Sequence, residues 1–205
     1  MRRELYTMCQ IEKTISYYNQ NAKTFAEGTL SLDFKSKQDL FAGKLQEGAR
    51  ILDFGCGAGR DTKYFMEKGF QVDALDGSEE LCRIASEFTG NPVKHAMFQD
   101  LDETERYDGI WACSSILHVS KAELPCILGK MAKAAKPCGI LYASFKYGDY
   151  EGERNGRYFT DMTEDTFAPL LQGIGNLSIE EQWVTKDVRP ERGNEKWLNL
   201  ILRKK

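Results

Sequence analysis

Short apolar runs alternate with amphipathic stretches from Arg50 onwards, which is the pattern of βαβ units in a parallel sheet. The apolar runs predict five strands, at Arg50–Phe54, Gln71–Leu75, Val93–Phe98, Tyr107–Cys113 and Gly139–Phe145. The amphipathic stretches predict three helices between them, at Arg60–Lys68, Glu79–Phe88 and Lys121–Lys136. The right-handed crossover rule then places these strands in one doubly wound sheet.

Helix boundaries carry their own signals. Ser78 precedes the second of these helices and can cap its first turn with a hydroxyl oxygen. The run Pro137-Cys138-Gly139 follows the third helix and predicts its end, because proline and glycine both interrupt helical hydrogen bonding.

The segment from Thr14 to Leu45 shows helical spacing of apolar residues and no strand-like alternation, which predicts two helices ahead of the sheet. Tyr17, Tyr18 and Phe25 give it a polar-aromatic face with no strand to pair with. We expect residues 1–46 to form a helical lid that excludes water from a site on the sheet. The alternative is plain packing of an extra helix on the sheet.

The pattern changes again after Phe145. A polar, glycine-rich stretch from Tyr147 to Tyr158 precedes a predicted helix near Glu164–Gln172. Two strand-like runs follow, Leu177–Val188 and Trp197–Leu202, and the turn sequence Arg189–Asn194 between them is too short for a crossover helix. They are therefore expected to form an antiparallel hairpin that closes one edge of the sheet.

The predicted fold is a single α/β domain over residues 1–205, with a doubly wound, mostly parallel seven-stranded sheet in an α/β core at 47–205. The length of 205 residues fits one domain, and 41% hydrophobic with 29% charged residues fits a packed globule. A net charge of −3 provides no large cationic field for nucleic acid or an anionic membrane.

No apolar run approaches the roughly 18 residues of a membrane span, and no secretory signal stands at the start, so a cytoplasmic location is expected. The cysteines lie at least 12 positions apart, which leaves no close pair for zinc and favours reduced thiols. They are Cys9, Cys56, Cys82, Cys113, Cys126 and Cys138. We therefore expect no metal, no nucleic-acid partner and no membrane partner; the oligomeric state stays open.

The segment from Ile51 to Asp61 is the most informative part of the chain. A buried strand ends in Gly55, Gly57 and Gly59, which allow the backbone to turn sharply and approach a ligand. The N-terminus of the following helix offers unpaired N–H groups. These features outline a nucleotide-type cofactor site, although a glycine cluster after a strand can also be only a tight turn.

Three acids follow consecutive strands of the predicted sheet. Asp53 lies near the end of the first strand, Asp76 ends the second, and Asp100 comes after the third. Ligands of such sheets bind outside the carboxyl ends of the strands, so the three carboxylates converge on one crevice. An acid at the tip of the second strand can accept hydrogen bonds from both ribose hydroxyls, whereas any one acid alone could be a solvated loop residue or a helix cap.

The dinucleotide fingerprint G-x-G-x-x-G is broken here, because Arg60 stands where its third glycine would be. The run Asp53-Phe54-Gly55-Cys56-Gly57-Ala58-Gly59, with the ordered acids behind it, resembles the class I S-adenosylmethionine-dependent methyltransferases. The resemblance covers about Arg50 to the C-terminus, late hairpin included. The Gly59-Arg60-Asp61 continuation and the opening at Tyr17–Ala22 are similar to small bacterial, tellurite-resistance-like members.

This resemblance implies S-adenosylmethionine as the cofactor. Asp53 and the backbone of Gly55, Gly57 and Gly59 would line its methionine part, Asp76 would bind the ribose diol, and Asp100 with Leu101 the adenine. The segment Cys113–His118 looks like the stretch of the family that passes beside the methionine part and opens onto the acceptor. Gly77, Ser114 and Tyr18 are also expected to contact the cofactor.

The expected reaction is in-line methyl transfer to a small-molecule acceptor, in which alignment in a dry pocket matters more than a nucleophilic side chain. If the acceptor must lose a proton, His118 is the candidate general base, because its ordinary pKa suits neutral pH. The alternative is a packing role for His118 on its loop. His95, in the third strand, is expected to be structural.

Basic residues are expected around the acceptor. Lys146 and Tyr147 follow the fifth strand and could touch it. Arg154, Arg157, Arg189 and Arg192 fall on loops at the carboxyl edge of the sheet, where guanidinium groups could bind a carboxylate or phosphate. The acceptor is therefore expected to be anionic or strongly polar. The alternative is a solvated loop paired internally with Glu151, Glu153 and Glu191.

Two other functions remain open at this point. One is a nicotinamide-dependent oxidoreductase, which Arg60 disfavours. The other is a non-catalytic S-adenosylmethionine-binding module, which the sequence does not distinguish from an enzyme because both would use the same binding residues. A nucleic-acid acceptor is disfavoured, since no Asn/Asp-Pro-Pro-aromatic tetrapeptide follows the fourth strand.

Overall fold

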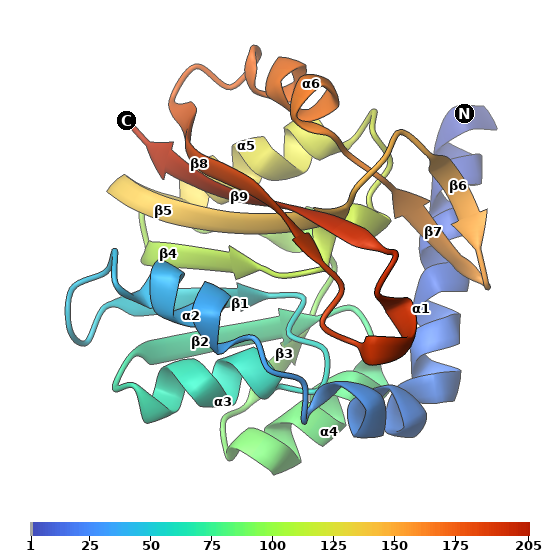
Figure 1. The fold of residues 1–205 in the computed structure, drawn as a ribbon, viewed down its shortest axis with the longest axis horizontal. Coiled ribbons are helices and arrows are strands. Elements are labelled where there is room, and N and C mark those ends of the chain that lie inside the picture. Colours follow the sequence, from blue (N-terminus) through green and yellow to red (C-terminus); the bar gives the residue numbers. More distant parts are fainter. Residues whose placement is uncertain (1) are drawn as a thin grey trace.

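The computed structural model describes residues 2–205, with side chains for residues 10–189 and 191–205. Seven strands form one twisted sheet in the order β3-β2-β1-β4-β5-β9-β8 (Figure 1). β1 to β5 and β8 point the same way, and β9 runs antiparallel between β5 and β8. The strands are β1 Arg50–Phe54, β2 Gln71–Asp76, β3 Val93–His95, β4 Tyr107–Ala112, β5 Ala135–Lys146, β8 Leu177–Lys186 and β9 Lys196–Lys204.

Helices cover both faces of the sheet. The helices are α1 Arg2–Thr29, α2 Lys35–Ala42, α3 Arg60–Glu67, α4 Glu79–Thr89, α5 Leu124–Ala134 and α6 Glu164–Phe167. On one face, Phe41 of α2 and Phe65 of α3 pack against Trp111 and Tyr142 of the sheet. On the other face, α5 and Phe167 of α6 pack against β4, β5 and β9. The α/β prediction is confirmed, as is the antiparallel hairpin that closes the edge.

Several helices and strands begin or end at other residues than predicted, and local sequence features explain some of the differences. β3 ends at His95, and Phe98, the last residue of the predicted strand, begins a 3₁₀ helix at Phe98–Asp100. α5 begins at Leu124, with a proline in its first turn, and not at Lys121. It ends at Ala134, before the predicted stop, because Pro137 disfavours a helical residue ahead of it. β5 therefore begins at Ala135 and includes the run from Pro137 to Gly139.

The stretch Tyr147–Tyr158, predicted without regular structure, contains a second sheet. β6 (Glu151–Arg154) and β7 (Arg157–Thr160) form an antiparallel hairpin with Arg154 opposite Arg157. Asn155 and Gly156 make its two-residue turn, with φ of 50° and 75°. Asn-Gly is the residue pair that such turns favour, because both positions need positive φ. This local signal was sufficient to predict the hairpin.

α1 is one helix of 28 residues that starts well before the predicted Thr14. It lies along the edge of the sheet where the parallel strands end, beside α4 and the β6–β7 hairpin (Figure 1). Ala22 and Ala26 pack against Ala58 and Leu81, and the Thr14 hydroxyl accepts a hydrogen bond of 3.0 Å from the backbone N–H of Tyr158. The position is compatible with the predicted lid.

Two further observations concern the described part of the chain. None of its helices is long and apolar enough to cross a membrane. Cys56, Cys82, Cys113, Cys126 and Cys138 are free thiols, while the side chain of Cys9 lies outside the described residues.

Candidate active site

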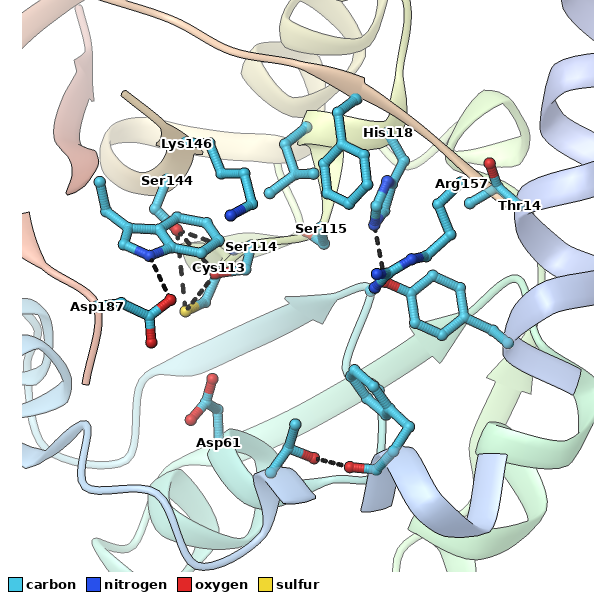
Figure 2. A pocket seen from close by; sticks show the side chains of 18 of the residues that line it. Thr14, Asp61, Cys113, Ser114, Ser115, His118, Ser144, Lys146, Arg157 and Asp187 are labelled. Atoms are coloured by element: carbon cyan, nitrogen blue, oxygen red, sulfur yellow. Dashed lines mark hydrogen bonds between the residues drawn. The ribbon is translucent and has the colours of Figure 1, made fainter. Parts of the chain in front are cut away.

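A cavity of about 770 Å³ lies at the carboxyl ends of the parallel strands. The glycine loop after β1 and the ends of β2 and β4 form its floor, and α1 covers one side. The β6–β7 hairpin and the turn between β8 and β9 form the rest of the wall. Side chains distant in the sequence, such as Thr14, Ser114, Arg157 and Asp187, therefore surround one space (Figure 2).

The glycine loop is packed too tightly for side chains. A Cβ on Gly55, whose φ is +84°, would lie 2.5 Å from the Cβ of Ser115. Gly59 has φ +89° at the N-cap of α3, and a Cβ there would lie 2.8 Å from Cγ2 of Thr89. Gly55 and Gly57 line the cavity, whereas Gly59 lies against α4 beneath it. The loop thus presents the backbone of Gly55 and Gly57 to the cavity, whereas Gly59, which was also expected there, does not line it.

Asp76 is fixed at the cavity by the backbone around it. Its Oδ2 accepts a hydrogen bond of 2.8 Å from the N–H of Gly57, and its Oδ1 accepts one of 2.8 Å from the N–H of Ser78. Burial raises the pKa of this carboxyl above its usual value, and the backbone N–H donors oppose that rise. Each oxygen keeps a second lone pair for a ligand hydroxyl. Gly77 lines the cavity beside it, in close contact with Ile15 of α1.

Asp53 lies beneath the cavity wall and is 2% exposed. Its Oδ2 accepts a hydrogen bond of 2.6 Å from the Thr62 hydroxyl. Burial and the nearby Asp61 carboxylate raise the pKa of Asp53. Asp53 therefore supports the glycine loop and α3. It does not line the cavity, in contrast to its expected contact with the methionine part of the cofactor.

The sequence analysis missed Asp61, which does line the cavity. Its carboxylate accepts hydrogen bonds from the Arg60 guanidinium, from Nε1 of Trp111 at 2.8 Å and from Nε2 of Gln38 at 2.7 Å. The Arg60 guanidinium lies 3.7 Å from the centre of the Phe34 ring. This network joins α2, α3 and β4. Arg60 stands at the position of the missing third glycine, and its side chain is paired with Asp61 and stacked on Phe34.

The loop after β3 turns two of the predicted residues away from the cavity. Asp100 accepts a hydrogen bond of 2.9 Å from the backbone N–H of Met97, and Leu101 is buried in the core at 3% exposure. Met97, Phe98 and Gln99 line the cavity instead. These three residues lie at the start of the 3₁₀ helix, which the sequence pattern did not predict. Nε2 of His95 lies 3.0 Å from the Gly77 carbonyl oxygen and forms a hydrogen bond with it, which is a structural contact.

His118 and Tyr18 meet across the cavity. The His118 Nδ1 lies 2.5 Å from the carbonyl oxygen of Tyr158, so Nδ1 carries the proton and donates it. Nε2 is then an acceptor, and the Tyr18 hydroxyl donates to it at 2.8 Å. Burial lowers the pKa of His118 to about 4, so the ring is neutral near pH 7 and is a weaker base than its ordinary pKa led us to expect. Figure 2 shows the His118 ring and the Arg157 side chain converging on this point.

Ser114 turns the chain sharply at the end of β4. Its φ of 54° is uncommon for a residue with a side chain, and the Ser144 hydroxyl accepts a hydrogen bond of 2.8 Å from its backbone N–H. Burial raises the pKa of the neighbouring Cys113 thiol to about 12. Cys113 therefore lines the cavity as a thiol and not as a nucleophilic thiolate.

The basic side chains at the mouth are largely paired. Asp187 accepts two hydrogen bonds from the Arg189 guanidinium, at 2.8 and 2.6 Å, Lys146 pairs with Glu195, and Arg154 pairs with Asp161. Their partners are not the three glutamates that the sequence suggested. Arg157 differs, since its buried Nε has no hydrogen-bond partner within the described residues. Lys146 and the four predicted arginines, Arg192 included, line the cavity, but Arg154 and Arg189 are already paired with carboxylates.

The neutral, enclosed state of His118 predicts a measurable pH dependence of stability. Its pKa is about 4 in the folded protein and near ~6.5 when unfolded, so between these values the unfolded chain binds more protons. Stability should therefore fall by about 2 kcal/mol from pH 7 to pH 5 on account of this group. Urea unfolding of the wild type and of His118→Gln at both pH values measures it. Equal pH dependence in the two proteins would contradict a neutral, buried His118.

Comparisons with known proteins agree with this geometry. A family described as "Methyltransferase domain" matches residues 51–139, which contain β1 to β4 and the glycine loop. The chain is 34% identical over 158 residues to a ubiquinone biosynthesis O-methyltransferase of Rhodopseudomonas palustris (strain BisB5). The chain is therefore similar to methyltransferases in its central sheet, in agreement with the resemblance of its glycine loop to the class I S-adenosylmethionine-dependent methyltransferases. The match to this relative covers 66% of the chain and 60% of the relative, less than two thirds of its length.

Solved structures show that the whole superfamily fold is present. A 1,6-didemethyltoxoflavin-N1-methyltransferase of Burkholderia thailandensis aligns with a TM-score of 0.77 at 22% identity, over 98% of this chain and 89% of that one. A TehB-like methyltransferase of Corynebacterium glutamicum aligns with a TM-score of 0.67 at 18% identity, over 93% and 98%. At such identities these likenesses establish the fold. The narrower resemblance to tellurite-resistance-like members stays a prediction.

Proposed function

We propose that this protein is an enzyme that transfers the methyl group of S-adenosylmethionine to a small polar molecule. The observation that carries the proposal is the position of Asp76, which faces the cavity with spare lone pairs between the glycine loop and α1. When bound, S-adenosylmethionine supplies an electrophilic methyl group. The cavity of about 770 Å³ is large enough to hold a cofactor and a small acceptor together.

The residues present fit that cofactor. Asp76 offers carboxylate oxygens for two ribose hydroxyls, and Gly55 and Gly57 leave the backbone open to the methionine part. Met97 and Phe98 offer apolar surface for the adenine, in place of Asp100 and Leu101. A nicotinamide dinucleotide is disfavoured, because the paired and stacked Arg60 stands where the dinucleotide fingerprint requires a third glycine for close packing of the helix on the strand.

The acceptor would lie beyond the glycine loop, between His118 and the β6–β7 hairpin. An acceptor proton can pass to the Tyr18 oxygen as Tyr18 passes its own proton to Nε2 of His118, while the Nδ1 proton stays on Nδ1 and is hydrogen-bonded to the Tyr158 carbonyl. Tyr18 is thus a positioning and relay residue as well as a wall of the cavity. Arg157 favours an acceptor with an anionic or strongly polar group.

The lid is part of the same proposal. Ile15 and Tyr18 of α1 line the cavity, and Thr14 ties the helix to β7. Bound cofactor would add contacts to this face, so backbone hydrogen exchange in residues 11–25 should slow when S-adenosylhomocysteine is added. Exchange in α5, which packs on one face of the sheet, is the internal reference. An unchanged rate in 11–25 would show that α1 packs on the sheet without covering the ligand.

Methyl transfer is tested with S-adenosylmethionine carrying a deuterated methyl group and a small-molecule extract as the source of acceptors. Mass spectrometry should find a new compound with the labelled methyl group, formed by the wild type and strongly reduced with His118→Gln. S-adenosylhomocysteine production without any labelled product would contradict an acceptor of this class. Cofactor binding with no turnover at all would favour the second candidate, a non-catalytic binding module.

A further inference from the structure

The β6–β7 hairpin turns one set of side chains toward the acceptor side of the cavity. Residues two apart in a strand share a face, and so do residues directly opposite in an antiparallel pair. Arg157 and Phe159 therefore share a face with Arg154, and both guanidinium groups contact the Phe159 ring, at 5.1 and 5.3 Å from its centre. Asp161 follows on the same side, just beyond the end of β7. All four residues line the cavity.

Arg157 is held firmly but leaves a donor unused. Its guanidinium carbon lies 4.4 Å from the centre of the Tyr17 ring, which fixes the plane of the group. Its Nη1 reaches the Tyr18 hydroxyl only at 3.5 Å. Its Nε is buried and has no hydrogen-bond partner in the described chain. A buried donor without a partner is costly, and native proteins rarely keep one without a reason.

Asp161 shows the complementary feature. Its side chain is 9% exposed, and Oδ2 accepts a hydrogen bond from Arg154. Its Oδ1 is buried and accepts no hydrogen bond from the residues that the structure describes. Burial raises the pKa of this carboxyl, and the Arg154 ion pair opposes that rise. One carboxylate oxygen is thus committed to the hairpin, and the other remains available to a ligand donor.

We propose that the β6–β7 hairpin is the acceptor-recognition element and that it recognises two groups of one small molecule. This inference rests on the proposed function. Asp161 Oδ1 accepts a hydrogen bond from an N–H or O–H of the acceptor, and Arg157 Nε donates one to a carboxylate or carbonyl oxygen. The acceptor class is therefore a small compound that carries both a donor and an anionic or carbonyl oxygen. A simple carboxylate or a simple alcohol satisfies only one of the two.

The probes are the three hydroxybenzoates and the three aminobenzoates, which vary the spacing of the two groups, with benzoate, phenol and aniline as single-group controls. Each is titrated calorimetrically into the protein saturated with S-adenosylhomocysteine. At least one two-group compound should bind ten times more tightly than every single-group compound. Arg157→Gln and Asp161→Asn should each remove that advantage and leave S-adenosylhomocysteine affinity within twofold of the wild type.

The controls separate the two levels of the proposal. Asp102→Asn, at a carboxylate whose side chain is 85% exposed, should change neither binding step. Melting curves confirm that each variant is folded, and Asp161→Glu, which keeps the carboxylate, is the second variant should Asp161→Asn fail to fold. If no two-group compound is preferred while S-adenosylhomocysteine binds, the hairpin does not recognise this class. If S-adenosylhomocysteine itself does not bind the wild type, the proposed function fails first.

Discussion

Asp76→Ala is expected to weaken S-adenosylhomocysteine binding by roughly 100-fold or more. A hydrogen bond to a charged acceptor contributes about 1.5–3 kcal/mol, and the carboxylate is positioned to accept two from a ribose diol. The same carboxylate fixes the N–H groups of Gly57 and Ser78, so its loss also loosens the loop that the ligand contacts. Calorimetric titration of the wild type and the variant measures the difference.

The matched control for this experiment is Asp102→Ala, since its carboxylate is exposed and pairs only with Lys133 at 2.8 Å among the side chains described. Its S-adenosylhomocysteine affinity should equal that of the wild type. Urea unfolding of both variants separates ligand contact from loss of structure. A folded Asp76→Ala protein that binds with wild-type affinity would show that Asp76 is not the ribose-binding acid.

Gly55→Ala is expected to destabilise the protein by about 3 kcal/mol or more. The new methyl group would lie 2.5 Å from the Cβ of Ser115 and 3.1 Å from the Phe98 ring. Overpacking of this kind costs about 1–3 kcal/mol, and a left-handed φ adds about 1–2 kcal/mol for a residue with a Cβ. Because Gly55 and Phe98 both line the cavity, cofactor affinity should fall as well.

Gly129→Ala supplies a contrast of opposite sign. Gly129 lies inside α5, and a Cβ there meets nothing within 4 Å. Alanine should therefore stabilise the protein by about 0.5–1 kcal/mol, through better helix propensity alone. Chemical denaturation of the two variants beside the wild type tests both signs. Equal small effects would mean that the glycine loop is less tightly packed than the structure indicates.

The strand pattern was sufficient to predict the sheet, because each buried parallel strand is a short apolar run and the glycine loop follows the first of them. The position of Asp76 followed from the same logic, since the second strand of such a sheet ends beside the first. The late hairpin was predictable too, because the link between its strands is too short for a crossover helix. These features depend on local sequence and on the topology of one sheet.

The acceptor side could not be predicted in the same way. The contact between Tyr18 and His118 joins residues 100 positions apart, and no spacing rule relates them. The pairing of Arg189 with Asp187 and of Arg154 with Asp161 depends on side-chain directions that only the folded hairpins define. One missed feature did have a local signal, the Asn155-Gly156 turn, and it would have placed Arg154 and Arg157 on one face.

The central claim is that the cavity binds the S-adenosyl group through Asp76 and the glycine loop. Calorimetry with S-adenosylhomocysteine and with NAD, on the same wild-type preparation, tests it most directly. The account predicts one S-adenosylhomocysteine molecule bound per chain and at least 100-fold weaker binding of NAD. Tighter binding of NAD than of S-adenosylhomocysteine would contradict it.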